Sequence, residues 1–166
     1  KHIADALAGF ESVGGRNSVA LCITQRAAIE RARGEREAAE RSFRDALQQY
    51  RALGTDGYLV PLVQLAVVLI EQWEHAEARA LLQDAIEALE RVGGWSSLGA
   101  LQVLMLPIVA LDNDWAEFDR LLPEADVLIT STGIVHDDIP AMARQAAELA
   151  RRAGERDRAR RAYEFA

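Results

Sequence analysis

The sequence has 166 residues, of which 50% are hydrophobic and 27% are charged, and it contains one cysteine, Cys22. A chain of this length and apolar content can bury a core, and its composition is unlike that of disordered or collagen-like proteins. A single cysteine excludes an internal disulfide framework and a cysteine-based zinc site, while a formal net charge of −7 argues against general nucleic-acid binding.

Helical patterns follow one another along the whole chain. Apolar residues recur at helical spacing, and no alternating strand pattern competes with them. We expect nine helices, at 1–13, 17–33, 35–53, 58–72, 75–92, 97–111, 114–131, 138–153 and 155–166. Pro107 lies inside the sixth of these helices and should kink it. Asp137 or Asp138 is expected to cap the eighth, with Pro140 in its first turn.

Regularly spaced glycines divide these helices into pairs. Gly14, Gly54, Gly93 and Gly133 each end a helical stretch, at spacings of 40, 39 and 40 residues, as expected of a residue that adopts the left-handed conformation without strain. A second turn, led by Gly34, Trp73, Asn113 or Gly154, falls within each interval. The repeats are therefore 1–14 (partial), 15–54, 55–93, 94–133 and 134–166 (partial).

The second helix of each pair repeats a small–large–small pattern on one face. Three sets of equivalent positions, separated by offsets of four and three, align as Ala39, Ala78, Phe118 and Ala159; Phe43, Leu82, Leu122 and Tyr163; and Ala46, Ala85, Ala125 and Ala166. These offsets fall on one side of a helix, and alternating small and large residues let two helices interlock closely.

This pattern resembles the tetratricopeptide repeat, most clearly in Gly34…Ala39…Phe43…Ala46 and Gly154…Ala159…Tyr163…Ala166. The pitch of 39 to 41 residues is longer than the usual value of about 34. The resemblance implies an all-α fold, a right-handed α-solenoid of antiparallel helix pairs, forming one domain over 1–166. The long pitch is similar to repeat regions of large bacterial signalling proteins, so we expect a cytoplasmic fragment of a longer chain.

No motif in the sequence indicates catalysis, and we expect neither an enzyme nor a cofactor. P-loop, metalloprotease and nucleophile-elbow patterns are absent. His136, Asp137 and Asp138 form a conceivable metal patch, but helix capping is the favoured interpretation, and no metal is expected. Trp73, Trp95 and Trp115, all near turns, either contact a ligand or, as we favour, pack between helix pairs. Cys22 and His75 are expected to be structural.

Charge is unevenly distributed along the chain. Residues 55–139 carry 15 acidic and 3 basic side chains, whereas both flanking segments are mildly basic. The acidic middle is either a surface that steers basic partners or, as we favour, a solubility surface. The uncharged run 92–111 contains three glycines, two serines and Pro107, so we do not expect a membrane span.

The resemblance also implies where a partner binds, because in tetratricopeptide arrays the first helices line a concave groove. The corresponding positions here are Leu21, Thr24, Ala28, Arg31, Val60, Val63, Val67, Ile70, Ala100, Val103, Pro107, Ala110, Arg144, Glu148 and Arg151. Such a groove is apolar in its middle with arginines at both ends, and it suits an amphipathic helix or an extended apolar peptide. Alternatively, these side chains bury one another, or cover a missing domain or a second copy.

We therefore expect a non-catalytic scaffold or regulatory module that binds a protein or peptide, and no nucleic acid. One alternative is a sensor that binds a small effector inside the superhelix, for which Thr24, Gln64 and Gln102 are the polar candidates. The other is a homodimerisation module.

Overall fold

The structure is a computed structural model that describes residues 15–133 and 137–166. Within these ranges the chain forms eight α-helices and one short 3-10 helix. They are α2 (Arg16–Ala32), α3 (Arg36–Leu53), η1 (Asp56–Tyr58), α4 (Leu59–Glu71), α5 (His75–Val92), α6 (Trp95–Leu111), α7 (Trp115–Thr132), α8 (Asp138–Arg152) and α9 (Arg156–Phe165).

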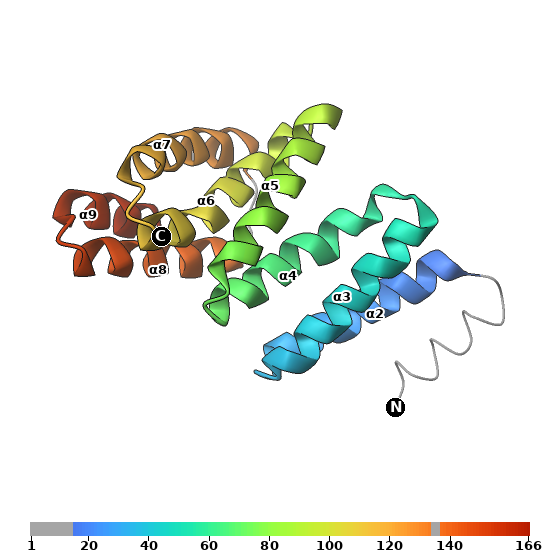
Figure 1. Cartoon of the computed structure of the whole chain (residues 1–166). Helices are drawn as coiled ribbons and strands as arrows, with labels where there is room; N and C mark the ends of the chain where they lie inside the picture. Colours follow the sequence, from blue (N-terminus) through green and yellow to red (C-terminus); the bar gives the residue numbers. More distant parts are fainter. Residues whose placement is uncertain (1–14, 134–136) are drawn as a thin grey trace. The chain divides into compact units, whose positions relative to one another are not determined.

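The all-α fold in antiparallel helix pairs is confirmed (Figure 1). Each of the eight helices begins and ends within two residues of its predicted bounds, and the expected helix at 1–13 lies outside the described residues. Helix α6 continues through Pro107 to Leu111, so this proline does not end the helix. Pro123 lies inside α7 in the same way, which the sequence reading had not noted.

Glycines follow three of the second helices in the left-handed conformation. Gly54 follows α3 with a φ of 65°, and Gly133 follows α7 with a φ of 66°. Gly93, after α5, has a φ of 70°. A residue with a Cβ is strained in this region, which explains the spacing of these glycines. Gly14, the first of the series, lies outside the described residues.

The first turn of α8 agrees with the expectation only in part. Asp137 stands at the N-cap position and Pro140 lies in the first turn, but the Asp137 side chain makes no capping hydrogen bond. The chain does use such a cap at α7, where the Asp114 Oδ1 atom accepts a hydrogen bond from the Glu117 backbone N–H at 3.2 Å.

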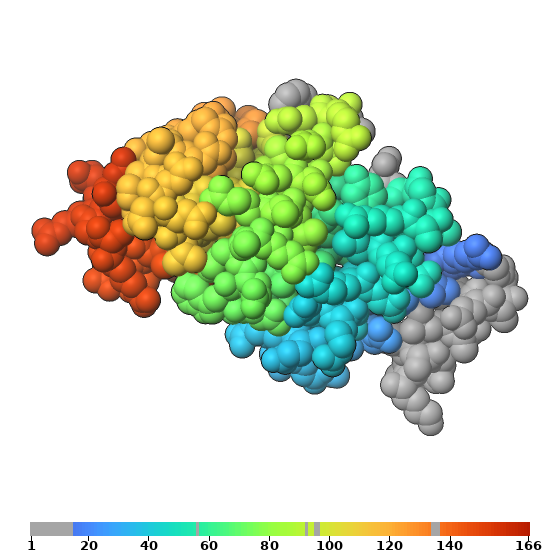
Figure 2. Space-filling model, viewed as in Figure 1, coloured from blue at the N-terminus to red at the C-terminus, as the bar shows by residue number. Residues whose placement is uncertain are grey.

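The chain divides into two compact units, residues 1–81 (unit 1) and 82–166 (unit 2), with the boundary inside α5. In unit 1, α3 packs on α2 and on α4, and α2 also contacts α4; in unit 2, α6 packs on α7 and α8, and α8 on α9. Within each unit the space-filling view shows neighbouring helices as bands in contact (Figure 2). A single domain over 1–166 and a right-handed superhelix stay predictions.

The interlocking face of the second helices forms much of the core. The small position is fully buried at Ala39 and Ala78 and is filled without exposure by Phe118. The large position is fully buried at Phe43 and Leu82, as the pattern predicted. Tyr163 differs, because it is 46% exposed and its hydroxyl lies 3.5 Å from the Glu148 carboxylate.

A close approach of α6 to α7 depends on Gly99. A Cβ at this buried position would lie 2.9 Å from the Leu128 Cβ and 3.3 Å from the Ala125 carbonyl oxygen. These distances are shorter than ordinary carbon contacts, so a side chain here would push the helices apart. Gly99 therefore sets the spacing of the pair.

Candidate interaction surface

The predicted groove residues lie on α2 and α4 in unit 1 and on α6 and α8 in unit 2. Within each unit these first helices contact each other directly, α2 with α4 and α6 with α8. The first helices of each unit are thus brought together, as the resemblance implied. The individual side chains, however, divide into a buried and an exposed group.

Several groove candidates belong to the core. Val67, Ile70 and Val103 are fully buried, and Pro107 is buried as well. The physical reason is that α4 and α6 are apolar on nearly every side, and a helix of this kind buries more than one face. We correct the expected groove accordingly: these four residues, together with Ala100 and Ala110, offer a partner no surface in this structure.

Thr24 is also unsuited to binding. It is buried, and its hydroxyl donates to the Ala20 carbonyl oxygen of the same helix at 2.9 Å. The hydroxyl is therefore already hydrogen-bonded, and the prediction that Thr24 contacts a partner is wrong for this structure.

The exposed candidates of unit 1 lie on α2 and α4, and we group them as the α2/α4 strip, defined by Leu21, Ala28, Val60 and Val63. Leu21 is 51% exposed and Val60 is 60% exposed, whereas Val63 is half-buried. Leu21 and exposed Ala28 are seven residues apart and thus share a helix face. Ile29, 40% exposed on α2, is a further exposed aliphatic side chain that the sequence reading missed.

Arg31 connects the two helices of the strip. Its Nη2 atom lies 2.6 Å from the Glu71 Oε1 atom, and its Nη1 atom lies 3.4 Å from the Gln64 Oε1 atom. Arg36 adds a longer contact, with its Nε atom 3.8 Å from the Glu71 Oε2 atom. The expected basic end of the groove in unit 1 is therefore neutralised by an ion pair between α2 and α4.

The arginines of α8 are exposed in unit 2. Arg151 and Arg152 both donate to Glu148, at 2.7 and 2.8 Å, and these hydrogen bonds lower the pKa of Glu148 to about 2. Arg144 is exposed and forms no ion pair with any residue in the described ranges. Of the predicted basic positions, Arg144 alone thus presents an unneutralised guanidinium within the described part of the chain.

Unit 2 contains a cavity of about 640 Å³ lined by α6 and α7, with Leu98, Pro123 and Val127 among its apolar side chains. Gln102 also lines it; its Nε2 atom donates to the Glu124 Oε2 atom at 3.0 Å, and its buried Oε1 atom receives no hydrogen bond. Of the three polar groups proposed for an effector, Thr24, Gln64 and Gln102, each already holds a protein partner.

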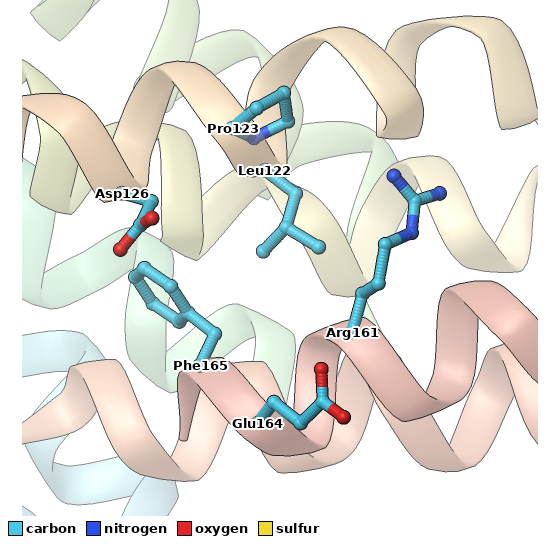
Figure 3. A pocket seen from close by; sticks show the side chains of 6 residues that line it. All are labelled: Leu122, Pro123, Asp126, Arg161, Glu164 and Phe165. Atoms are coloured by element: carbon cyan, nitrogen blue, oxygen red, sulfur yellow. The ribbon is translucent and has the colours of Figure 1, made fainter.

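A smaller cavity of about 290 Å³ lies where α7 faces α9 (Figure 3). Leu122, Pro123 and Phe165 form its apolar part, while Asp126, Arg161 and Glu164 bring charged groups to it. Arg161 is not available to a ligand there, because its guanidinium pairs with Asp119.

The tryptophans differ in their surroundings. Trp115 is half-buried, lies edge-on to Phe118 at 5.9 Å between ring centroids, and carries the Arg158 guanidinium 5.6 Å from its ring centroid. Phe118 lies on the same helix and Arg158 on α9, so Trp115 contacts the next helix pair, which agrees with the expected packing role. Trp73 is 57% exposed and meets buried His75 edge-on at 5.5 Å. The side chain of Trp95 lies outside the described residues, as does His136.

Two ion pairs between second helices were not anticipated from the sequence. The Arg44 Nη1 atom lies 2.6 Å from the Glu77 Oε1 atom in unit 1, and the Arg158 Nη2 atom lies 2.5 Å from the Asp119 Oδ2 atom in unit 2. The hydrogen bond from Arg44 lowers the pKa of Glu77, and that from Arg158 lowers the pKa of Asp119. The only available signal was opposite charge at roughly one repeat spacing.

Other expected features concern metals and membranes. Among the residues in the described ranges, no three histidine, cysteine or acidic side chains are grouped as metal ligands. In the same ranges, none of the helices combines the length and apolar character needed to cross a bilayer. Cys22 is a free, half-buried thiol.

Residues 19–91 match the family model of the tetratricopeptide repeat. No curated protein sequence is significantly similar to the chain. Among solved structures, BtubC (BKLC) from P. vanneervenii is similar with a TM-score of 0.69 and 14% identity, over 90% of this chain and 62% of that protein. This chain thus spans less than two thirds of BtubC, and the likeness shows the fold.

Residues 19–91 therefore carry tetratricopeptide-like helical repeats, a type of repeat that is generally a protein–protein interaction module and typically non-catalytic.

Proposed function

We propose that the chain binds another protein at the α2/α4 strip and acts as a non-catalytic regulatory module. The observation that supports this most strongly is the pair of exposed aliphatic side chains, Leu21 and Val60, on two first helices that contact each other. Repeats of this type generally bind proteins or peptides, and the corresponding helices hold the ligand in the family that the sequence resembles.

The strip suits an apolar segment of a partner protein. Covering an exposed aliphatic side chain contributes about 1.5–3 kcal/mol when the burial is complete. Val63 and Ala28 add smaller apolar areas, and the Arg31–Glu71 ion pair borders the strip with groups that are already paired. An amphipathic helix or an extended apolar peptide matches these properties.

We further propose that the module is the cytoplasmic regulatory part of a larger bacterial signalling protein. This proposal is supported by the repeat pitch of 39 to 41 residues, which is similar to that of repeat regions in such proteins.

The two other functions considered have weaker support. A small-effector sensor needs convergent polar groups, whereas Thr24 and Gln64 already engage protein atoms in unit 1. A second copy of the chain can cover the same strip, and the oligomeric state distinguishes that case.

The test is capture of partners on the purified, immobilised chain, with Val60→Asp as the test variant and Val127→Asp as the control. Val127 is 66% exposed in unit 2 and lies outside the strip. We expect the same proteins to bind wild type and Val127→Asp but not Val60→Asp. Equal retention by all three overturns the proposal, and so does a stable dimer of wild type in light scattering that Val60→Asp dissolves.

A further inference from the structure

Trp73 occupies a backbone conformation that a tryptophan rarely adopts. The four mid-repeat turns place one residue each in the left-handed region: Gly34 with φ 78°, Trp73 with φ 67°, Asn113 with φ 56° and Gly154 with φ 86°. Glycine is unstrained there and asparagine tolerates it, but a bulky side chain clashes with its own backbone. Of these four turns, that of Trp73 alone carries a large strained residue.

The turn itself does not require this residue. Trp73 and Gly34 close their turns with matching backbone hydrogen bonds, Glu74 N–H to the Leu69 carbonyl oxygen at 2.8 Å and Glu35 N–H to that of Glu30 at 2.9 Å. The strain at Trp73 therefore does not arise from a different turn geometry.

Burial does not explain the tryptophan either. An added Cβ at Gly34 would meet no atom within 4 Å, so this position of the turn faces open space. Trp73 is accordingly 57% exposed, and its ring meets His75 edge-on. A side chain that is strained, large and exposed is the combination expected of a binding residue, because strained backbone concentrates at functional positions.

We propose that Trp73 receives a cationic side chain, arginine or lysine, of a partner protein on its indole ring, and that the carboxylate of Glu74, the next residue in the sequence, attracts this cation. Glu74 is exposed and forms no ion pair with any residue that the structure describes. Trp is the aromatic residue that binds cations best. This inference rests on the proposed function and adds a second contact on unit 1, with a stated chemistry.

The surroundings of the ring favour a cation over an apolar group. The exposed residues next to Trp73 in the sequence are Glu74, Ala76 and Glu77, which offer no large apolar surface. Glu71 and Glu77 pair with arginines of other helices, so among these neighbours Glu74 supplies the negative charge that attracts a cation.

The experiment measures binding of a fluorescent hexa-arginine peptide to the purified chain, and the thermal midpoint of each variant. Trp73→Gly removes ring and strain together, whereas Asn113→Gly is the matched change at the equivalent turn in unit 2. We expect Trp73→Gly to weaken binding by about 2- to 10-fold, the range of an exposed to partly desolvated cation–π contact. Its midpoint should rise by roughly 2–4 °C because the backbone strain is relieved. Asn113→Gly should change neither value appreciably.

A second variant, Trp73→Phe, keeps the strained backbone with a weaker ring and should give intermediate affinity without the rise in midpoint. Unchanged affinity of Trp73→Gly overturns the proposal, because the peptide is then held by general charge alone. A lowered midpoint of Trp73→Gly also overturns it, because the tryptophan is then a structural residue. Partner capture on Trp73→Gly, in which Leu21 and Val60 are unchanged, reports on the α2/α4 strip separately, so failure here and failure of the proposed function are distinguishable.

Discussion

Arg31 on α2 and Glu71 on α4 are 40 residues apart in the sequence, and their side chains meet at 2.6 Å. The pair spans one repeat and joins two consecutive first helices. Both side chains are largely shielded from water, with 19% and 24% exposure. The pair therefore fixes α2 and α4 next to each other, which is the arrangement on which the α2/α4 strip depends.

We predict a measurable coupling between these two residues. Charged hydrogen bonds that are partly shielded are stronger than exposed surface pairs, so a double-mutant cycle of Arg31→Met and Glu71→Gln should give about 1 kcal/mol of interaction energy. Urea unfolding of the four proteins measures it. A coupling near zero would mean that the strip is held together by apolar packing alone.

Stability should decline in acid partly because of Asp119. The hydrogen bonds from Arg158 and Arg161 lower its pKa below the ordinary value of 3.8. The ion pairs of Asp119 with Arg158 and Arg161 therefore contribute their full stability above the ordinary, unfolded-state pKa. This contribution is lost as the pH falls through the lower pKa of the folded state. Urea midpoints from pH 7 to pH 2 should drop less steeply below pH 4 for Asp119→Asn than for wild type. Parallel curves for the two proteins would exclude this role.

Gly99→Ala should destabilise the chain although it places alanine inside a helix. In a helix interior this change normally stabilises by roughly 0.5–1 kcal/mol. Here the new methyl group would lie 2.9 Å from the Leu128 Cβ. We expect a net loss of about 1–3 kcal/mol, as for an overpacked core, measured by urea unfolding. A gain in stability would show that α6 and α7 separate without cost.

The repeat pattern predicted the helices and their turns because both depend on local signals. Glycines that end helices and small–large alternation are visible in one sequence, and Phe43 and Ala39 are buried as that alternation predicted. The assignment of faces on α4 failed at Val67 and Ile70 for a physical reason. In a helix that is apolar nearly all round, periodicity does not distinguish the side that contacts neighbours from the side that faces water.

Ion pairs between repeats could not be predicted from the sequence either. Arg31 pairs with Glu71, and Asp119 with Arg158, only because helices one repeat apart stack on each other. The charge of a residue in the sequence does not indicate which opposite charge it will pair with. Trp73 is different, since it aligns with Gly34 and Gly154 in the sequence. This alignment is a signal for a left-handed position that the sequence analysis did not use.

Aspartate substitutions should separate the surface of α4 from its core. Val60→Asp places a charge at a site that is 60% exposed and should change stability by no more than about 0.5 kcal/mol. Val67→Asp places a charge at a fully buried site, and it should unfold the protein or lower the free energy of unfolding by more than about 4 kcal/mol. Circular dichroism during urea unfolding compares the two, and a similar loss in both would place Val60 in the core.

The most direct test of the account is photo-crosslinking from the α2/α4 strip in a cell extract. A photoreactive phenylalanine analogue replaces Val60 in one protein and Val127, exposed in unit 2, in the control. We predict that position 60 gives a discrete adduct with another protein and that position 127 does not. Absence of an adduct at position 60, equal adducts at both positions, or a product with the mass of two copies of the chain would contradict the claim that this strip binds a partner protein.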